Sequence, residues 1–149
     1  MIRKATIYDI FKIADMWAKM EKERSIKDRD GNDAEKEKFL YGLTQKIYNP
    51  VRTILVDERE GEVIAFIMNN SYYCEYGTSH MIGTCEHLYV EPEHRDKGIA
   101  GKLVETSKNM NKAMGVKEYE FIIGYDPKLI KAYERKGYTP KEIILTQEV

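Results

Sequence analysis

Cysteine and proline are scarce in this chain, and long hydrophobic runs are missing. Its 149 residues include two cysteines and four prolines. The cysteines, Cys74 and Cys85, are too few for a disulfide scaffold, and no window approaches the ~18 apolar residues typical of a membrane span. The N-terminal segment also lacks the apolar run of a secretory signal peptide. These absences favour a soluble cytoplasmic protein with no membrane partner.

The chain also has no excess of charge of one sign. It contains 24 basic and 25 acidic residues, for a formal net charge of -1. No global field would therefore attract the protein to nucleic acid or to an anionic surface, and we expect no nucleic-acid partner. Any anion site must be local. The length fits one domain with a single sizeable core, so we expect one domain over residues 1–149.

Hydrophobic periodicity predicts alternating strands and helices in a mixed α/β domain. The runs at 51–57 and 62–68 flank a short glycine-containing loop and should pair as an antiparallel hairpin. The state of residues 69–80 stays open at this stage. The expected strands are 2–6, 51–57, 62–68, 81–90, 118–123 and 142–146, and the expected helices span about 9–24, 34–48, 99–114 and 127–136.

The most informative segment follows the strand at 81–90, where a proline-marked turn leads into Arg95-x-x-Gly98-x-Ala100 and a helix. Unpaired N–H groups and the helix dipole favour an anion at such a helix start. Gly98 lets the backbone approach a phosphate closely, and Ala100 is the next smallest choice. The glycine patterns of nucleotide P-loops and of dinucleotide-binding folds are missing, which counts against ATP and NAD.

This segment resembles the acetyl-coenzyme A (CoA) loop of the GCN5-related N-acetyltransferase (GNAT) superfamily. A second segment, from Asp126 through Tyr133 to Gly137 and Tyr138, is similar to the family's helix-and-turn motif. The two motifs occur in the family's order, and the resemblance covers nearly the whole chain. It implies a GNAT-like fold, with a mostly antiparallel central sheet, about four flanking helices and strands that splay apart at the CoA site.

The resemblance further implies acetyl-CoA as cosubstrate, with the backbone at 88–90 beside the pantetheine and 95–101 around the pyrophosphate. Asp96 departs from the family pattern, because a carboxylate beside a pyrophosphate is unfavourable unless it points to solvent. Asp126 replaces an asparagine and loses an amide donor. The expected cofactor-binding residues are Leu88, Tyr89, Val90, Arg95, Asp96, Lys97, Gly98, Ile99, Ala100, Gly101, Asp126 and Tyr133.

Two residues are candidates for catalysis. In the family, the tyrosine matching Tyr133 points at the sulfur of CoA, and a phenol can protonate a departing thiolate. Several amine-acetylating relatives carry a proposed base at the position of Glu86. Strand alternation would place Glu86 on one face with Leu88 and Val90, and Cys85 on the other with His87 and Tyr89. The alternatives are a tyrosine packed in the core and a solvated or salt-bridged glutamate.

The sequence counts against a metal site and against covalent catalysis. The cysteines and histidines of the central region, Cys74, His80, Cys85, His87 and His94, match no compact zinc spacing, so we expect no metal. A strand cysteine such as Cys85 is usually a small apolar residue. The family normally transfers the acetyl group directly in a ternary complex.

The acceptor is the least defined component. By resemblance it lies against the 25–33 segment and the aromatic-rich loop, with Tyr72, Tyr73 and Glu75 as substrate-binding candidates. Acidic residues there favour a cationic amine, although neighbouring basic residues weaken the field. Three functions stay open: N-acetylation of a small-molecule or peptide amine, non-catalytic acyl-CoA binding, and an interaction domain that keeps only the fold. A homodimer also stays open.

Overall fold

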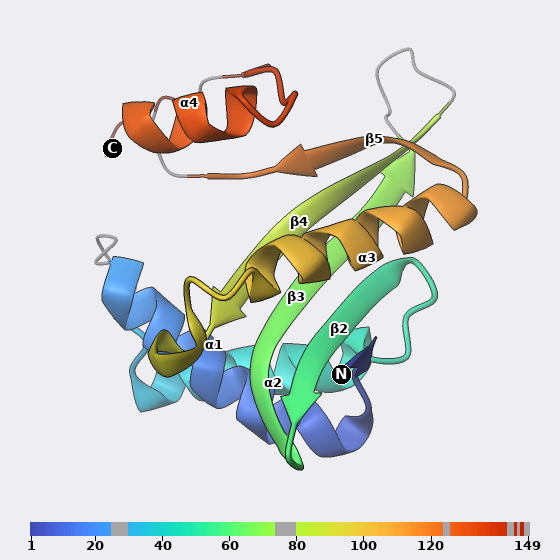
Figure 1. The fold of residues 1–149 in the computed structure, drawn as a ribbon. Coiled ribbons are helices and arrows are strands. Elements are labelled where there is room, and N and C mark those ends of the chain that lie inside the picture. The colour runs from blue at the N-terminus through green and yellow to red at the C-terminus, as the bar shows by residue number, and fades with distance from the viewer. Residues whose placement is uncertain (25–29, 74–79, 124–125, 143–144, 146, 148–149) are drawn as a thin grey trace.

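The computed structural model describes residues 1–24, 30–73, 80–123, 126–142, 145 and 147, and these contain a five-stranded sheet (Figure 1). Neighbouring strands are antiparallel except for the last pair, which is parallel. Parallel neighbours need a crossover connection, and a helix supplies it here. The strands, in spatial as well as chain order, are β1 (Ile2–Lys4), β2 (Arg52–Arg59), β3 (Glu62–Tyr73), β4 (Met81–Val90) and β5 (Val116–Phe121).

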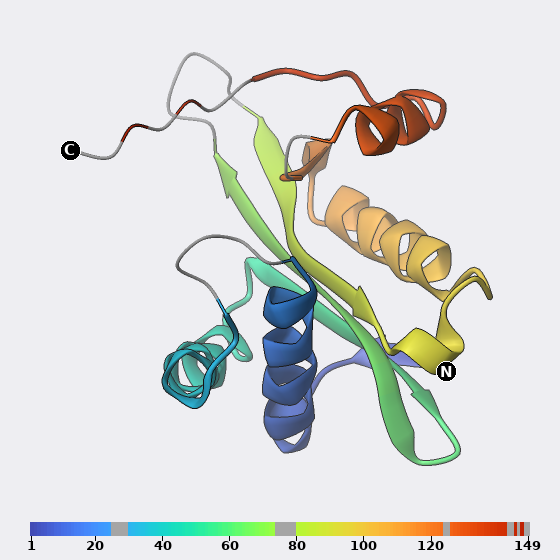
Figure 2. The same ribbon diagram turned by 90° about the vertical axis from the view of Figure 1, so that its left-hand side faces the viewer.

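Helices cover both faces of this sheet. α1 (Ile10–Arg24) and α2 (Asp33–Lys46) lie on one face, and the crossover helix α3 (Ile99–Ala113) lies on the other (Figure 2). The short α4 (Pro127–Glu134) follows β5. The arrangement confirms the predicted mixed α/β fold, in which most strand pairs are antiparallel. Among the described helices, none has the length and apolar character needed to cross a membrane.

Two hydrophobic clusters bind the layers together. Ile13 and Met16 of α1 pack against Phe66 and Met68 on one face of the sheet. Leu103 of α3 packs on the opposite face, in a cluster that includes Leu55, Ile67 and Cys85. Because successive strand residues point to opposite faces, the continuous apolar runs of β2 and β3 supply both clusters.

Several boundaries differ from those that the sequence predicts. β3 continues to Tyr73, well beyond the expected 62–68, although polar residues follow Met68. Two of these are buried beneath α3 and are satisfied there: the Asn69 amide donates to the Ser107 hydroxyl, and the Ser71 hydroxyl donates to Asn111 Oδ1 over 2.7 Å. Such partners cannot be read from a local pattern.

The N-terminal and C-terminal strands differ as well. β1 is shorter than the expected 2–6, and β5 begins at Val116 and ends at Phe121. For the strand expected at 142–146, Glu142 and Leu145 have no strand structure, and 143, 144 and 146 lie outside the described residues. That strand therefore finds no support in the described part of the chain.

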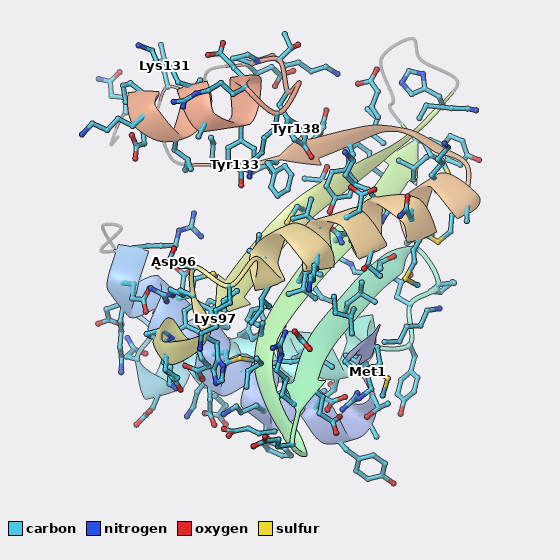
Figure 3. The ribbon with its side chains drawn as sticks, viewed as in Figure 1. Met1, Asp96, Lys97, Lys131, Tyr133 and Tyr138 are labelled. Carbon is cyan, nitrogen blue, oxygen red and sulfur yellow. The ribbon has the colours of Figure 1, made fainter. Side chains whose placement is uncertain are left out.

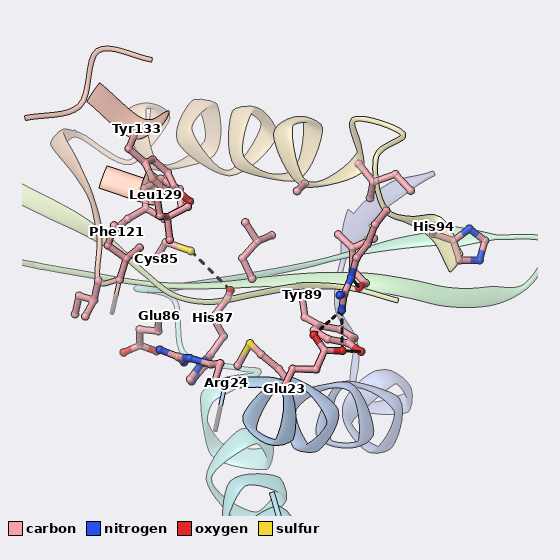
Figure 4. Close-up of a pocket in the computed structure, with 18 of the residues that line it drawn as sticks. Glu23, Arg24, Cys85, Glu86, His87, Tyr89, His94, Phe121, Leu129 and Tyr133 are labelled. Carbon is pink, nitrogen blue, oxygen red and sulfur yellow. Dashed lines mark hydrogen bonds and ion pairs between the residues drawn. The ribbon is translucent and has the colours of Figure 1, made fainter. Parts of the chain in front are cut away.

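A β-bulge in β4 overturns the predicted alternation around Glu86. His87 pairs with Met68 and Cys85 pairs with Asn69, so Glu86 is an extra residue with no partner of its own in β3. A bulge places consecutive residues on the same face, because the period of two is interrupted. Cys85 therefore shares the α3 face with Leu88 and Val90, whereas Glu86 and His87 both lie on the face of α1 and α2 (Figure 4).

Candidate active site

An open cavity of about 700 Å³ lies where β4 and β5 separate. The two strands pair only as far as Cys85 and Phe121, and β4 continues to Val90 without β5, paired only with β3. The walls of the cavity come from the end of α1, the second half of β4, the loop before α3, the end of β5, and α4 (Figures 3 and 4). The two strands therefore splay apart here, as the resemblance to the GNAT superfamily implies.

The loop between β4 and α3 has the geometry of an anion site. Asp96 and Gly98 both adopt left-handed backbone conformations, with φ of 60° and 74°. Glycine takes this conformation without strain, and aspartate is among the residues that tolerate it. The first N–H group of α3 that donates within the helix is that of Lys102, which bonds to Gly98 O over 3.1 Å. The earlier N–H groups of α3 remain available to a ligand.

Arg95 ties this loop to the end of α1. Its guanidinium donates to both carboxylate oxygens of Glu23 over 2.8 and 2.9 Å, and its Nε donates to Val90 O over 2.9 Å. It also lies 5.2 Å from the centre of the Tyr89 ring, whose hydroxyl donates to Glu23. The main contacts of Arg95 thus stiffen the turn. We call Arg95, Glu23 and Tyr89 the clasp.

The turn is anchored from beneath as well. Glu91 is buried, its N–H donates to Ile64 O over 2.9 Å, and its carboxylate accepts from Lys19 Nζ over 2.8 and 3.0 Å. Lys97 Nζ donates to Glu93 O over 2.9 Å and so turns back onto its own loop. The loop is therefore shaped before any ligand arrives, which lowers the entropy lost on binding.

Tyr133 of α4 lies in the cavity wall, across from the Asp96 loop (Figure 3). Its ring packs 4.9 Å from Phe121 and 5.5 Å from Tyr138. Burial raises the pKa of its hydroxyl above the ordinary tyrosine value. The hydroxyl makes no hydrogen bond to any of the described residues, so it is a protonated donor still available at neutral pH.

Cys85 of β4 lines the same cavity as Tyr133. Burial raises the pKa of its thiol to about 12, and the nearby Glu86 charge acts in the same direction. A thiolate is the reactive form of cysteine, so Cys85 is not activated as a nucleophile. Its Sγ lies 3.7 Å from His87 O. The side chain packs as a small apolar group, as the sequence suggests.

Glu86 faces the opposite side of β4 and lines the cavity there. Its Oε2 accepts from Arg52 Nη1 of β2, so the carboxylate is salt-bridged, one of the alternatives that the sequence leaves open. Its side chain remains 27% exposed. A carboxylate with both a cation and open space beside it can still accept a further hydrogen bond.

Not every residue predicted for binding reaches this cavity. Lys97, Gly101 and Asp126 are outside its walls. The Asp126 side chain instead caps α4, accepting from the N–H groups of Lys128 over 2.9 Å and Leu129 over 3.4 Å. The predicted residues that do line the cavity are Glu86, Leu88, Tyr89, Val90, Arg95, Asp96, Gly98, Ile99, Ala100 and Tyr133.

The predicted acceptor residues lie elsewhere on the described surface. Tyr72 donates to Glu120 of β5 over 3.4 Å, and Tyr73 is exposed; neither lines the cavity. Glu75 lies outside the described residues. Within the part of the chain that the structure describes, no cluster of three or more potential ligands could hold a metal ion.

The structure also adds wall residues that the sequence did not indicate. The end of α1 contributes Met20, Glu23 and Arg24. The wall around Tyr133 also contains Phe121 and Leu129. The three α1 residues have the spacing of an ordinary amphipathic helix, so no local sequence signal distinguishes them as cavity residues. Only the packing of α1 beside β4 brings them to the cavity.

Comparison with known proteins agrees with this geometry. A possible acetyltransferase from Clostridium difficile has 20% identity and a TM-score of 0.81, over 100% of this chain and 97% of that one. Glucosamine-6-phosphate N-acetyltransferase from Arabidopsis thaliana has 21% identity and a TM-score of 0.70, over 99% and 97%. A predicted acetyltransferase from Clostridium acetobutylicum, solved with acetyl-CoA, has 16% identity and a TM-score of 0.80, over 99% and 95%. At these identities the likeness shows the fold alone.

Curated protein sequences provided no match. A family profile, described as "Acetyltransferase (GNAT) domain", matches residues 50–140. That range is more than half of the chain and contains both the loop at Arg95 and the helix of Tyr133. The chain belongs to the GNAT acetyltransferase family.

Proposed function

We propose that this protein is an acetyl-CoA-dependent N-acetyltransferase that transfers the acetyl group to a primary amine of a small molecule or peptide, by direct attack in a ternary complex. The observation that carries the proposal is a single cavity that joins a preformed anion-binding loop to a protonated tyrosine and a carboxylate. The loop suits the CoA pyrophosphate, and the splayed end of β4 leaves backbone groups beyond Cys85 free of β5 for the pantetheine. A related fold has been solved with acetyl-CoA.

The reaction needs two proton transfers, and the groups for them lie on opposite faces of β4. Bond formation between the amine nitrogen and the acetyl carbon is accompanied by cleavage of the carbon–sulfur bond. The sulfur leaves as a thiolate, and Tyr133 transfers its hydroxyl proton to it. The raised pKa of Tyr133 keeps that proton in place at neutral pH until charge develops on the sulfur.

The amine requires the opposite proton transfer. An alkyl amine with a pKa of about 10.4 is almost wholly protonated at pH 7, at a cost of about 4.6 kcal/mol for reaction through its neutral form. Glu86, on the α1 and α2 side of β4, is our candidate to take that proton, directly or through a water. Its ion pair with Arg52 fixes the carboxylate beside the cavity.

Two measurements test this function. Isothermal titration with acetyl-CoA should show binding, and release of free CoA thiol should depend on an added amine. Binding without thiol release across a broad amine panel would favour a non-catalytic acyl-CoA module. Absence of binding would leave only a fold-based interaction role and would contradict the proposal.

A further inference from the structure

The guanidinium of Arg24 is a charged group in the cavity wall that the proposed chemistry does not use. Arg24 is the last residue of α1, and its side chain is 34% exposed. Its one hydrogen bond or ion pair among the described residues is with Glu21 Oε1, over 3.4 Å, which is long for a hydrogen bond. A guanidinium has five N–H donors, so most of its binding capacity is unused.

Two carboxylates of the cavity wall already have a cation beside them. Glu86 is paired with Arg52, and Glu23 is paired with Arg95. Neither carboxylate therefore needs Arg24 as its cation. Glu21 itself is wholly buried, and its second oxygen has no hydrogen-bond partner among the described residues. This carboxylate holds the guanidinium from the protein side and leaves its remaining donors for the cavity.

The position of Arg24 assigns it to the acceptor half of the site, an assignment that rests on the proposed function. Its side chain extends along the α1 and α2 face of β4 near Glu86 and His87, whereas Cys85, Phe121 and Tyr133 lie on the other side of the strand (Figure 4). An amine delivered to Glu86 would therefore lie in the same half of the cavity as Arg24.

We propose that Arg24 binds an anionic group, a carboxylate or a phosphate, on the acceptor whose amine is acetylated. Guanidinium groups match both anions with paired hydrogen bonds. The acceptor class is then a small amine that also carries an acid group, rather than a polycation, which offers no anion to the remaining N–H donors of Arg24. The acidic residues that the sequence suggested for a cationic acceptor do not line this cavity where they are described, namely Asp30 and Asp33.

Matched acceptor pairs test this specificity. Thiol release is measured with L-leucine against L-leucinamide, and with D-glucosamine 6-phosphate against D-glucosamine. The first pair detects a carboxylate and the second a phosphate. We expect the anionic member of at least one pair to have a kcat/KM about tenfold higher or more. Arg24→Gln should bring that ratio close to one by raising the KM for the anionic acceptor, while the KM for acetyl-CoA stays constant.

A binding measurement removes the dependence on choosing a good acceptor. With the protein saturated with CoA, inorganic phosphate is titrated at constant ionic strength. Wild type should bind phosphate about tenfold or more tightly than Arg24→Gln. The affinity of Arg24→Lys should lie between the two, because lysine keeps the positive charge but cannot form the paired hydrogen bonds of a guanidinium. Arg135→Gln, which removes an exposed arginine from outside the cavity, should match wild type in both experiments.

The outcomes separate this inference from the proposed function. Acetyl-CoA turnover with no preference for anionic acceptors, or equal phosphate binding by wild type and Arg24→Gln, would overturn the role of Arg24 alone. Preference for a polycation such as spermine would do the same. Failure to bind acetyl-CoA would overturn both.

Discussion

Arg95 and Asp96 are consecutive in the loop, yet the structure gives them different roles. Arg95 donates hydrogen bonds to Glu23 and to the carbonyl of Val90, so it stabilises the shape of the turn. Asp96 stands in a left-handed conformation that few residues tolerate, with its side chain exposed. The carboxylate that looked unfavourable beside a pyrophosphate is explained by this backbone requirement.

Replacing Tyr133 with phenylalanine removes the proton donor but keeps the ring that packs on Phe121. We expect kcat to fall by about a hundredfold, in the range of general acid catalysis, with little change in the KM for acetyl-CoA. Because burial raises the pKa of Tyr133, activity of the wild type should show no loss assignable to Tyr133 ionisation below about pH 10. Initial rates of thiol release over pH 6 to 10 check both points, and Tyr48→Phe, at an exposed tyrosine outside the cavity, is the control. Unchanged turnover in Tyr133→Phe would remove it as the acid.

Glu86→Gln preserves the size of the side chain but removes its basicity. If Glu86 accepts the amine proton, kcat should fall by about a hundredfold at pH 7, and part of the loss should be recovered as the pH approaches the pKa of the amine. The measurement is the pH profile of kcat with one fixed acceptor. Full activity with a flat profile would exclude Glu86 and point to a water chain.

At the scale of elements, contacts between distant segments decide the geometry of the site. The clasp joins the last turn of α1 to the loop before α3, across 72 positions of sequence. The bulge in β4 turns Glu86 toward α1 and α2, where Arg52 of β2 meets it. The Glu23–Arg95 ion pair thus joins α1 to the loop before α3, and the Arg52–Glu86 ion pair joins β2 to β4.

Glu23→Gln tests the clasp. It weakens the hold on Arg95 and the bond from Tyr89, so the loop should lose part of its preformed shape and acetyl-CoA should bind about fivefold more weakly. The cost in the free energy of unfolding should be about 1 kcal/mol or less, because both charged groups are partly exposed. Titration with acetyl-CoA measures the affinity, and urea unfolding measures the free energy of unfolding. Glu37→Gln, at an exposed position of α2, is the matched control; tighter cofactor binding in Glu23→Gln would show that Glu23 chiefly repels the pyrophosphate.

At the scale of the whole molecule, the N-terminal strand is joined to the turn before α1 by a partly buried ion pair. Arg3 donates to both oxygens of Asp9 over 2.8 and 2.9 Å, and the Thr6 N–H donates to the same carboxylate over 2.7 Å. Asp9 is only 6% exposed. These contacts, led by Arg3, lower the pKa of Asp9.

The lowered pKa gives stability a predictable pH dependence. Below about pH 4 the unfolded chain binds a proton at Asp9 more readily than the folded one, so this contribution is complete at neutral pH and is lost as the pH falls through the folded pKa. Asp9→Asn should therefore cost about 2 kcal/mol of unfolding free energy at pH 7 and clearly less at pH 3. Urea unfolding at both pH values measures this difference. Asp15→Asn, at an exposed ion pair, should change stability by about 0.5 kcal/mol or less; an equal cost of Asp9→Asn at both pH values would contradict the assignment.

The sequence by itself determined the family and the mixed sheet, and it predicted the loop at Arg95 as the binding site of the acetyl donor. Those features depend on residues that are close together in the sequence, such as Arg95-x-x-Gly98-x-Ala100 and the continuous apolar runs of β2 and β3. Tertiary structure alone decided which way Glu86 points, because one bulged residue reverses a period of two. It also decided that Glu23 and Arg24 reach the cavity, since only the packing of α1 against β4 brings these sequence-distant residues to it.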